Sequence, residues 1–456
     1  LLANTTGASN TAVGKDALYA NTTASYNTAV GKSALEANTT GTRNVAVGAM
    51  ALDANTTAND NTAVGYNAAT AITTGVSNTA IGASSLLTLT TGSRNTSLGY
   101  NALTLQTDAS DNVGIGNYAG GAITTGAYNT MVGSLSGDGL TTGGSNVGVG
   151  YRALSSASFN ASNCTAVGRD SGLAITTGGD NTALGYLALS ALTTGDNCIA
   201  IGVDTLDAAT TASNTVAIGN GALGAQTTAS TNTAVGHAAG TAVTTGHSTT
   251  LVGKDAGAAI TTGIQNTCIG QDAGDTITTG HRNIVVGYAA DTTYTNSEST
   301  IKIGEQFTGN EANHTVSLGN DSGYIWNAFT TNATWAQVSD RRLKKNIEED
   351  DLGLAFINAL KPVTYNWKTN EEIDPEFFES KVHKGEKRDT ETTMHGFIAQ
   401  EVKAAMDSVG NTTFTGWWDD TGDGEGVGLT DFIMPLVKAV QELSAQVEEL
   451  KSKIEE

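Results

Sequence analysis

The sequence predicts a repetitive all-β shaft followed by an α+β domain that ends in a coiled-coil helix. A glycine preceded by an aliphatic residue recurs every 17 residues as far as residue 304 of the 456. All three prolines and all five tryptophans lie beyond residue 320. Residues 1–338 hold 9 Lys and Arg against 20 Asp and Glu, whereas the shorter remainder holds 14 against 25. So sharp a change in composition indicates separate structural parts.

The repeat runs through 18 copies with a single one-residue insertion. The residue before each glycine is Val, Ile or Leu, the residue three before it is Thr, Val or Ile, and the one between is mostly small. This alternation is typical of a short strand with β-branched residues on one face and alanine on the other. Four residues before the glycine, asparagine stands in 13 of the 18 copies, where stacked amides can form a hydrogen-bonded ladder.

A 17-residue unit cannot bury its apolar face alone, so the copies must stack. The Gly and Thr-rich turns would break a helix, and the strictly kept aliphatic positions argue against disorder. We therefore predict a β-solenoid or β-roll shaft over residues 1–304, with two short strands and two tight corners per copy. At about 4.8 Å per coil the shaft would be roughly 85 Å long. The alanine face suits close contact between neighbouring chains and, equally, the tight interior of a single-chain solenoid.

Residues 305–338 leave the 17-residue register and bring in Trp326 and Trp335. We expect these aromatic residues to close the end of the stack as a cap. The alternative is a binding tip, where a glycan stacks on the rings.

Charge and composition exclude several classes of function. The net charge of −22 without a basic tract argues against nucleic acid and anionic membrane as partners, and no apolar run reaches membrane-spanning length. The three cysteines fit no zinc pattern, and the acidic stretch 419–425 lacks the bidentate glutamate of a calcium loop. We expect neither a metal nor a cofactor. Leu1 enters in the middle of a repeat, so we expect the natural chain to extend upstream.

The predicted domain 339–456 alternates helix and strand signals. Apolar spacing predicts a helix over 351–360, then a strand at 363–367 and a second helix over 397–406. Within a predicted coiled coil at 431–456, a heptad seam consists of Ile433, Leu436, Val440, Leu443, Val447, Leu450 and Ile454. β-Branched a positions with leucine at d favour two strands. An amphipathic helix lying on its own domain is the alternative.

The junction reads SDRRLKKNI from Ser339 to Ile347. A serine hydroxyl becomes a nucleophile when a base takes its proton, and a lysine is such a base only when its amine is neutral. Burial and neighbouring cations push Lys344 toward neutrality. From spacing alone, a basic linker between two domains is the favoured interpretation.

The junction resembles the opening of the endosialidase-type intramolecular chaperone of phage tail spikes and fibres. ALKPVTYNWK (Ala359 to Lys368), HGFIAQEV (His395 to Val402) and PLVKAVQEL (Pro435 to Leu443) follow in the order of that family. The resemblance implies a homotrimer whose chaperone guides folding upstream and then cuts itself off. It implies Ser339 as nucleophile, Lys344 as base and the Ser339–Asp340 bond as cleavage site, with the bond before Ser339 as the less favoured choice. The trimer that the resemblance implies conflicts with the preference of the seam for two strands.

We therefore expect a tail-fibre segment of the virion that binds a host cell-surface glycan or protein and joins other tail proteins upstream. The chaperone fragment would be released in the host cytoplasm after folding. The repeat also resembles the head of trimeric bacterial adhesins, so a bacterial or phage-derived adhesin is one alternative. An ice- or polysaccharide-surface binder using the Thr-Thr rows is another. The scattered acids of the shaft predict no glycosidase, which needs two carboxylates about 5–10 Å apart.

Overall fold

The computed structural model describes residues 1–292, 294–306, 313–320, 323–328, 341, 344–369, 372, 390–420 and 424–455. Trp335, Ser339 and Asp340 therefore lie outside the described residues. The chain divides into two compact units, residues 1–338 and 339–456. This division coincides with the change in composition at the junction.

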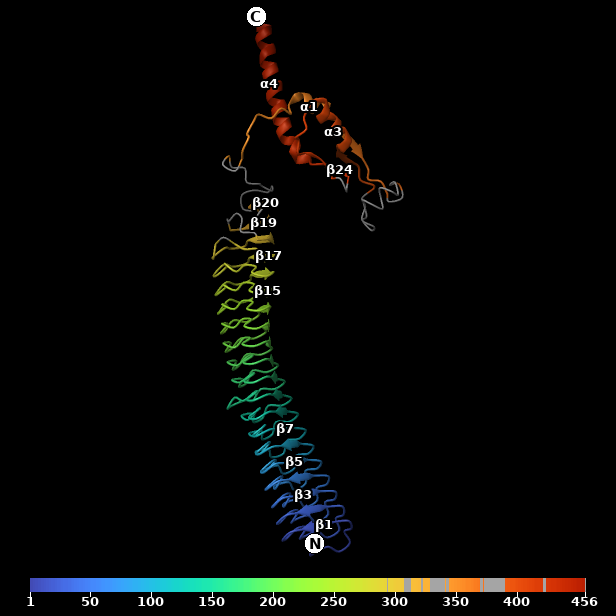
Figure 1. The fold of residues 1–456 in the computed structure, drawn as a ribbon, viewed down its shortest axis with the longest axis vertical. Coiled ribbons are helices and arrows are strands. Elements are labelled where there is room, and N and C mark those ends of the chain that lie inside the picture. Colours follow the sequence, from blue (N-terminus) through green and yellow to red (C-terminus); the bar gives the residue numbers. More distant parts are fainter. Residues whose placement is uncertain are drawn as a thin grey trace. The chain divides into compact units, whose positions relative to one another are not determined.

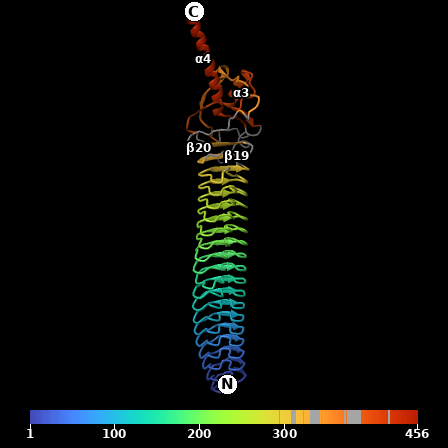
Figure 2. The ribbon, with the colours of Figure 1, turned by 90° about the vertical axis from the view of Figure 1, so that its left-hand side faces the viewer.

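The first unit is a β-solenoid in which each coil contributes one strand to a single sheet (Figure 1). Figure 2 shows the strands of successive coils stacked one above another. Strands β1 to β19 are parallel, each paired with the next, and β20 is antiparallel to β19. The strands are β1 (Thr11–Val13), β2 (Thr28–Val30), β3 (Val45–Val47), β4 (Thr62–Val64), β5 (Thr79–Ile81), β6 (Thr96–Leu98), β7 (Val113–Ile115), β8 (Thr130–Val132), β9 (Val147–Val149), β10 (Thr165–Val167), β11 (Thr182–Leu184), β12 (Ile199–Ile201), β13 (Val216–Ile218), β14 (Thr233–Val235), β15 (Thr250–Val252), β16 (Thr267–Ile269), β17 (Ile284–Val286), β18 (Ile301–Glu305), β19 (Thr315–Asn320) and β20 (Gly323–Ala328).

The strand register follows the sequence period. Thr11 pairs with Thr28, 17 residues on, and the one-residue insertion appears where Val147 pairs with Thr165. The extra residue is taken up in the turns, so the strands stay aligned across it. The β-solenoid of the predicted 17-residue period is thus confirmed.

The alanine side of each strand faces the interior of the solenoid. The middle residues of β2, β3 and β4 are fully buried alanines, whereas Val13 and Val47 beside them are exposed. A small side chain fits inside where the opposite wall of the narrow coil supplies a buried leucine such as Leu18. The larger Met131 and Leu251 take the same inner position where the opposite residue is a glycine. Of the two interpretations of the alanine face, the tight interior is the one observed.

Each coil has one strand, not the two that were predicted. The stretch after the glycine turns instead, because Asp16 and Leu18 adopt left-handed conformations with φ of 58° and 49°. Such conformations are unfavourable for non-glycine residues. They are held here because Leu18 is buried and its N–H donates to the carbonyl of Ala34 in the next coil, at 3.0 Å.

Two columns of asparagine hold neighbouring coils together. The N–H of Asn44 donates to Oδ1 of Asn27 at 2.9 Å, and Nδ2 of Asn44 donates to the carbonyl of Ala58 at 2.8 Å. In the second column the amides bond directly, as from Nδ2 of Asn38 to Oδ1 of Asn21 at 3.1 Å. The predicted ladder exists, but the asparagines before the glycines bond chiefly to backbone, which satisfies buried groups of the turns.

The last two strands continue the sheet beyond the repeat. Trp326 on β20 is the Cα partner of Ser317 on β19, and Ser317 is in turn the partner of the fully buried Lys302 on β18. Nε1 of Trp326 and Oγ of Ser317 are buried without a hydrogen-bond partner. Trp326 thus belongs to the inner column of the sheet, a position that suits closure of the stack.

The second unit is a small α+β domain. Its elements are α1 (Leu354–Ala359), β21 (Val363–Tyr365), β22 (Met394–Gly396), α3 (Ala399–Ser408), β23 (Trp417–Asp420), β24 (Gly424–Val427), the 3₁₀ helix η3 (Leu429–Phe432) and α4 (Ile433–Glu455). β21 pairs with β22, and β23 with β24, both antiparallel. Phe356, Phe414 and Phe432 meet in the core with ring centres 5.0 to 6.2 Å apart. Within the described residues, no helix has both the length and the apolar character to cross a membrane.

Candidate functional site

The described residues of the junction are 341 and 344–347, and their basic side chains face solvent. The N–H of Lys344 donates to the carbonyl of Arg341 at 3.2 Å. Arg341, Lys344 and Lys345 are all exposed in the single chain. Lys344 is therefore not buried in one chain alone.

A cleft of about 790 Å³ lies directly after these basic residues. One wall is the segment that follows them, and the other comes from the loop after α3 and the start of α4. The residues that line it are Asn346, Glu348, Glu349, Asp350, Asp351, Leu352, Asn411, Thr413, Phe414, Thr415, Thr430, Asp431, Met434 and Pro435.

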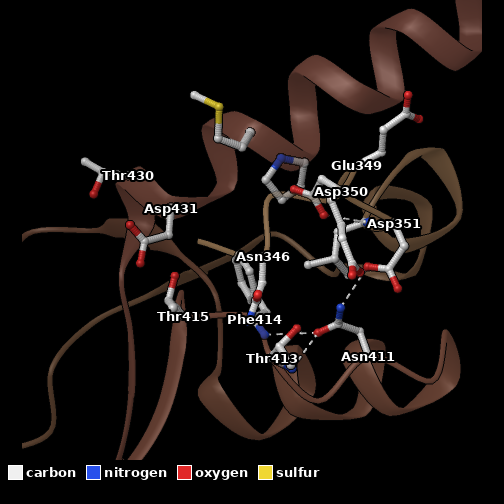
Figure 3. Close-up of a pocket in the computed structure, with 14 residues that line it drawn as sticks. Asn346, Glu349, Asp350, Asp351, Asn411, Thr413, Phe414, Thr415, Thr430 and Asp431 are labelled. Carbon is white, nitrogen blue, oxygen red and sulfur yellow. Dashed lines mark hydrogen bonds between the residues drawn. The ribbon is translucent and has the colours of Figure 1, made fainter. Parts of the chain in front are cut away.

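Asn411 joins the two walls of the cleft. Figure 3 shows Asn411 and Asp351 turned toward each other, and Nδ2 of Asn411 donates to Oδ1 of Asp351 at 2.9 Å. Oδ1 of Asn411 accepts from the N–H groups of Thr413 and Phe414, at 2.9 and 3.0 Å. Because Asn411 is buried, leaving part of its amide without hydrogen-bond partners would destabilise the fold. The amide thereby fixes the course of the chain just after the junction.

Five carboxylates, Glu348, Glu349, Asp350, Asp351 and Asp431, make the cleft acidic. Part of this charge is compensated, since Lys438 of α4 lies 3.5 Å from Glu349 and Oδ1 of Asp350 accepts from the N–H of Leu352 at 2.9 Å. Within the described ranges, no group of three His, Cys, Asp or Glu is arranged to hold a metal ion.

The seven seam residues lie on α4 and are between 41% and 83% exposed. Another face of α4 packs against α1 and buries Pro435 and Ala439. The alternative in which the seam itself lies on its own domain does not hold, because the domain occupies that other face. The seam is left uncovered in a single chain.

The outer face of the shaft strands also carries an apolar row. It consists of the aliphatic residue before each glycine and the Thr, Val or Ile two residues earlier, repeated over 18 strands. Val13, Ile81, Leu98 and Leu184 are examples that remain exposed in the single chain. We call this surface the outer strand face.

Sequence reasoning missed two groupings of the shaft. Asp291 is buried, and both this burial and a hydrogen bond with Asp275 raise its pKa to about 7. The second is a column of Tyr151, Arg169 and Tyr186 in three successive coils. For this column the 17-residue register was the signal, because residues at equal offset from the glycines become neighbours. Asp275 and Asp291 stand at different offsets, so the register did not indicate their contact. Asp255 and Asp272, by contrast, lie on a corner where Asp255 pairs with Lys254 at 2.9 Å.

The junction and the wall of the cleft that follows it lie in a segment with a recognisable family signature. Residues 339–411 match the family model described as the chaperone of endosialidase. That family is a self-cleaving intramolecular chaperone. The match begins at Ser339, where the second compact unit begins, and ends at Asn411 of the cleft. Together with the long β-solenoid, the chaperone match fits a tail fibre with an endosialidase-type chaperone domain. No curated protein matches the chain.

Proposed function

We propose that this chain is a segment of a homotrimeric tail fibre whose chaperone domain assembles the shaft and then cleaves itself off at the Ser339–Asp340 bond. The observation that carries the proposal is the chaperone match that starts at Ser339, the first residue of the second unit. One cut at this boundary separates the whole shaft from the whole chaperone.

In the proposed reaction Ser339 is the nucleophile and Lys344 its general base. Hydrolysis consumes one water and leaves a carboxyl group on Ser339 and an amine on Asp340. The exposure of Lys344 in the single chain supports a dependence on assembly, because neighbouring chains would have to bury the amine before it loses its proton. Cleavage would then follow correct folding.

The two uncovered apolar surfaces support a trimer. An aliphatic row over 18 strands and a seam of seven residues on α4 both gain by leaving water. The repeat makes slipped pairings nearly as good as the correct one, so a shaft alone would find its register slowly. A C-terminal template that aligns three chains at one height removes that ambiguity, and its later release makes unfolding hard to reverse.

Intact-mass measurement on the purified protein tests the cleavage. Wild type should yield two fragments meeting at Ser339 and Asp340 without added protease, in a single turnover. Ser339→Ala and Lys344→Ala should each stay full length and still form trimers, whereas the neighbouring Lys345→Ala should cleave. A wild-type trimer that stays whole, or normal cleavage of Lys344→Ala, would show that the dyad is wrong.

The freed shaft is proposed to contact the host surface as part of the virion tail, with a glycan or protein as receptor. Neighbouring genes distinguish the alternative of a bacterial adhesin: secretion genes would indicate an adhesin, and tail and capsid genes would indicate a tail fibre.

The hydrogen bonds of the Thr-Thr turns weaken the ice-binding alternative. The first threonine of each pair donates to the next coil, as from Oγ1 of Thr22 to the carbonyl of Thr39 at 3.1 Å, which removes one of its two hydroxyl rows.

A further inference from the structure

Each of the strands β1 to β17 is followed by the repeat glycine, which we call the strand-ending glycine. The residue directly after it lies on a solvent-exposed ridge along the shaft. The residues of successive coils stack there in one column, and the exposed tyrosines of the column are Tyr66, Tyr100, Tyr151, Tyr186 and Tyr288. Tyrosine offers a large rigid face at low entropic cost, which suits it to recognition of ligands. One place on this ridge combines the rings with positive charge.

At that place the guanidinium of Arg169 lies between two tyrosine rings. Its central carbon is 6.0 Å from the ring centre of Tyr151 in the preceding coil and 5.6 Å from that of Tyr186 in the following coil. Both distances are within the range of cation–π attraction, about 6 Å. The two rings stand two coils apart, about 9.6 Å along the axis. The arrangement holds both aromatic faces and the cation in fixed positions.

The positive charge of this place is in excess. Arg169 donates through Nε to Oδ2 of Asp170 at 3.1 Å, and Nη1 of Arg152 lies 3.4 Å from Oδ1 of the same carboxylate. Other arginines of the shaft have an acid each, as Arg43 has Asp60 and Arg94 has Asp111. Here two guanidinium groups share one carboxylate, in a shaft with only nine Lys and Arg.

The shared carboxylate is also incompletely satisfied. Asp170 is buried, and its Oδ1 makes no hydrogen bond, because the 3.4 Å approach of Arg152 is an ion pair without hydrogen-bond geometry. Both arginine side chains remain accessible, with 41% of Arg152 and 65% of Arg169 exposed. A guanidinium has five N–H donors, and the bond to Asp170 uses one of those of Arg169.

We infer that Tyr151, Arg152, Arg169 and Tyr186 form a subsite for an acidic saccharide. A sugar ring presents an apolar face that packs on a tyrosine, and its carboxylate is the anion that a guanidinium fork binds in bidentate fashion. The excess cation supplies the charge complementarity, and the two rings hold successive sugar units on either side of it. This inference rests on the proposed role of the shaft in host contact and names the class of its receptor.

Binding is measured by calorimetry on the full chain with three probes: hexamers of galacturonate, of mannuronate and of hyaluronan, each beside its carboxyl-reduced form. At least one acidic hexamer should bind, and its reduced form should bind about ten-fold more weakly, a difference of about 1.4 kcal/mol. Arg169→Gln and Tyr186→Ala should each weaken binding to a similar degree, whereas Tyr186→Phe should retain it. Arg169→Lys should bind with intermediate strength, because it keeps the charge and loses the planar fork.

The matched control is Tyr100→Ala. Tyr100 occupies the same offset in its coil, and its ring contacts Tyr118 edge-to-face at 5.7 Å. Its loss should leave binding of the acidic hexamers unchanged. The subsite is refuted if none of the three binds, if the reduced forms bind equally well, or if Tyr100→Ala matters as much as Tyr186→Ala. Trimer formation and self-cleavage, measured on the same samples, report on the proposed function separately from this site.

Discussion

Glu442 of α4 caps the first helix of the chaperone domain from 88 residues away. Its Oε2 accepts a hydrogen bond of 2.7 Å from the N–H of Leu354, the first residue of α1. The N-cap residue Gly353 has no side chain to do this, and a Cβ there would lie 2.3 Å from the Glu442 carboxylate. The contact ties the junction side of the domain to the helix that carries the seam.

Replacing Glu442 by glutamine should therefore destabilise the chaperone domain by about 1 kcal/mol, because a helix N-terminus loses its anion. Urea unfolding of the full-length Ser339→Ala protein measures this loss. Glu448→Gln is the control, since Glu448 makes only an exposed contact with Lys451 and should cost at most about 0.5 kcal/mol. Equal losses in the two variants would contradict the capping role.

The seam should control both assembly and cleavage. Leu443→Glu places a charge on the exposed seam of α4, whereas Ala445→Glu places the same charge two residues away, off the seam. We expect the first variant to remain monomeric and uncleaved and the second to trimerise and cleave like wild type. Light scattering and intact mass report the two outcomes. Cleavage of a monomeric Leu443→Glu chain would show that assembly does not activate Lys344.

The shaft should lose stability as the pH rises toward neutrality. Burial and the contact with Asp275 raise the pKa of Asp291 from an ordinary 3.8 to about 7 in the folded chain. The folded state thus binds this proton more tightly than the unfolded state, so the stabilisation is complete below about pH 4. It declines through the window up to pH 7, above which both states are ionised.

Thermal unfolding between pH 4 and 8 tests this dependence. Asp291→Asn should flatten the decline and should be more stable than wild type at pH 8. Its amide oxygen can still accept the N–H of Thr276, which now donates to Asp291 at 3.0 Å. Asp272→Asn, on the neighbouring corner, should keep the wild-type profile. An unchanged profile in Asp291→Asn would refute the assignment.

The strand-ending glycines should be far less replaceable than glycines in open turns. Gly31 has a φ of +138°, and a Cβ there would lie 2.4 Å from the carbonyl oxygen of Gly48 in the next coil. Gly221 also has positive φ, +63°, but a Cβ would meet nothing within 4 Å. We expect Gly221→Ala to cost about 1 kcal/mol and Gly31→Ala clearly more. Hydrogen exchange in the flanking coils is the suitable measurement, because long arrays do not unfold in one step.

The three cysteines should be unreactive in the folded shaft. Burial raises the pKa of Cys198 to about 11 and that of Cys268 to about 12, and it raises the pKa of Cys164 as well. Thiolate is the reacting form, so iodoacetamide at pH 8 should modify none of them until guanidinium unfolds the chain. Rapid labelling of the native protein would contradict the buried placement.

The sequence by itself determined the period, the number of coils, the boundary at Ser339 and the seam on α4. These features follow from local patterns: the aliphatic-glycine step at each coil, the change in charge density, and the apolar spacing from Ile433 to Ile454. A period-two strand shows that two faces differ, but it does not say which one faces inward. The tertiary structure decided that Ala29 is inside and Val13 outside, because a small side chain fits opposite the buried leucines of a narrow coil.

Contacts between coils likewise came only from the tertiary structure. Whether Arg169 stacks on Tyr151 or Asp291 meets Asp275 depends on side-chain direction and burial at a given height, which one coil's sequence does not specify. The second predicted strand failed for the same reason, since hydrogen bonds to the next coil hold Leu18 in a left-handed turn against its local preference. The capping of Leu354 by Glu442 joins segments that no local pattern connects, because it exists only once α1 and α4 are packed together.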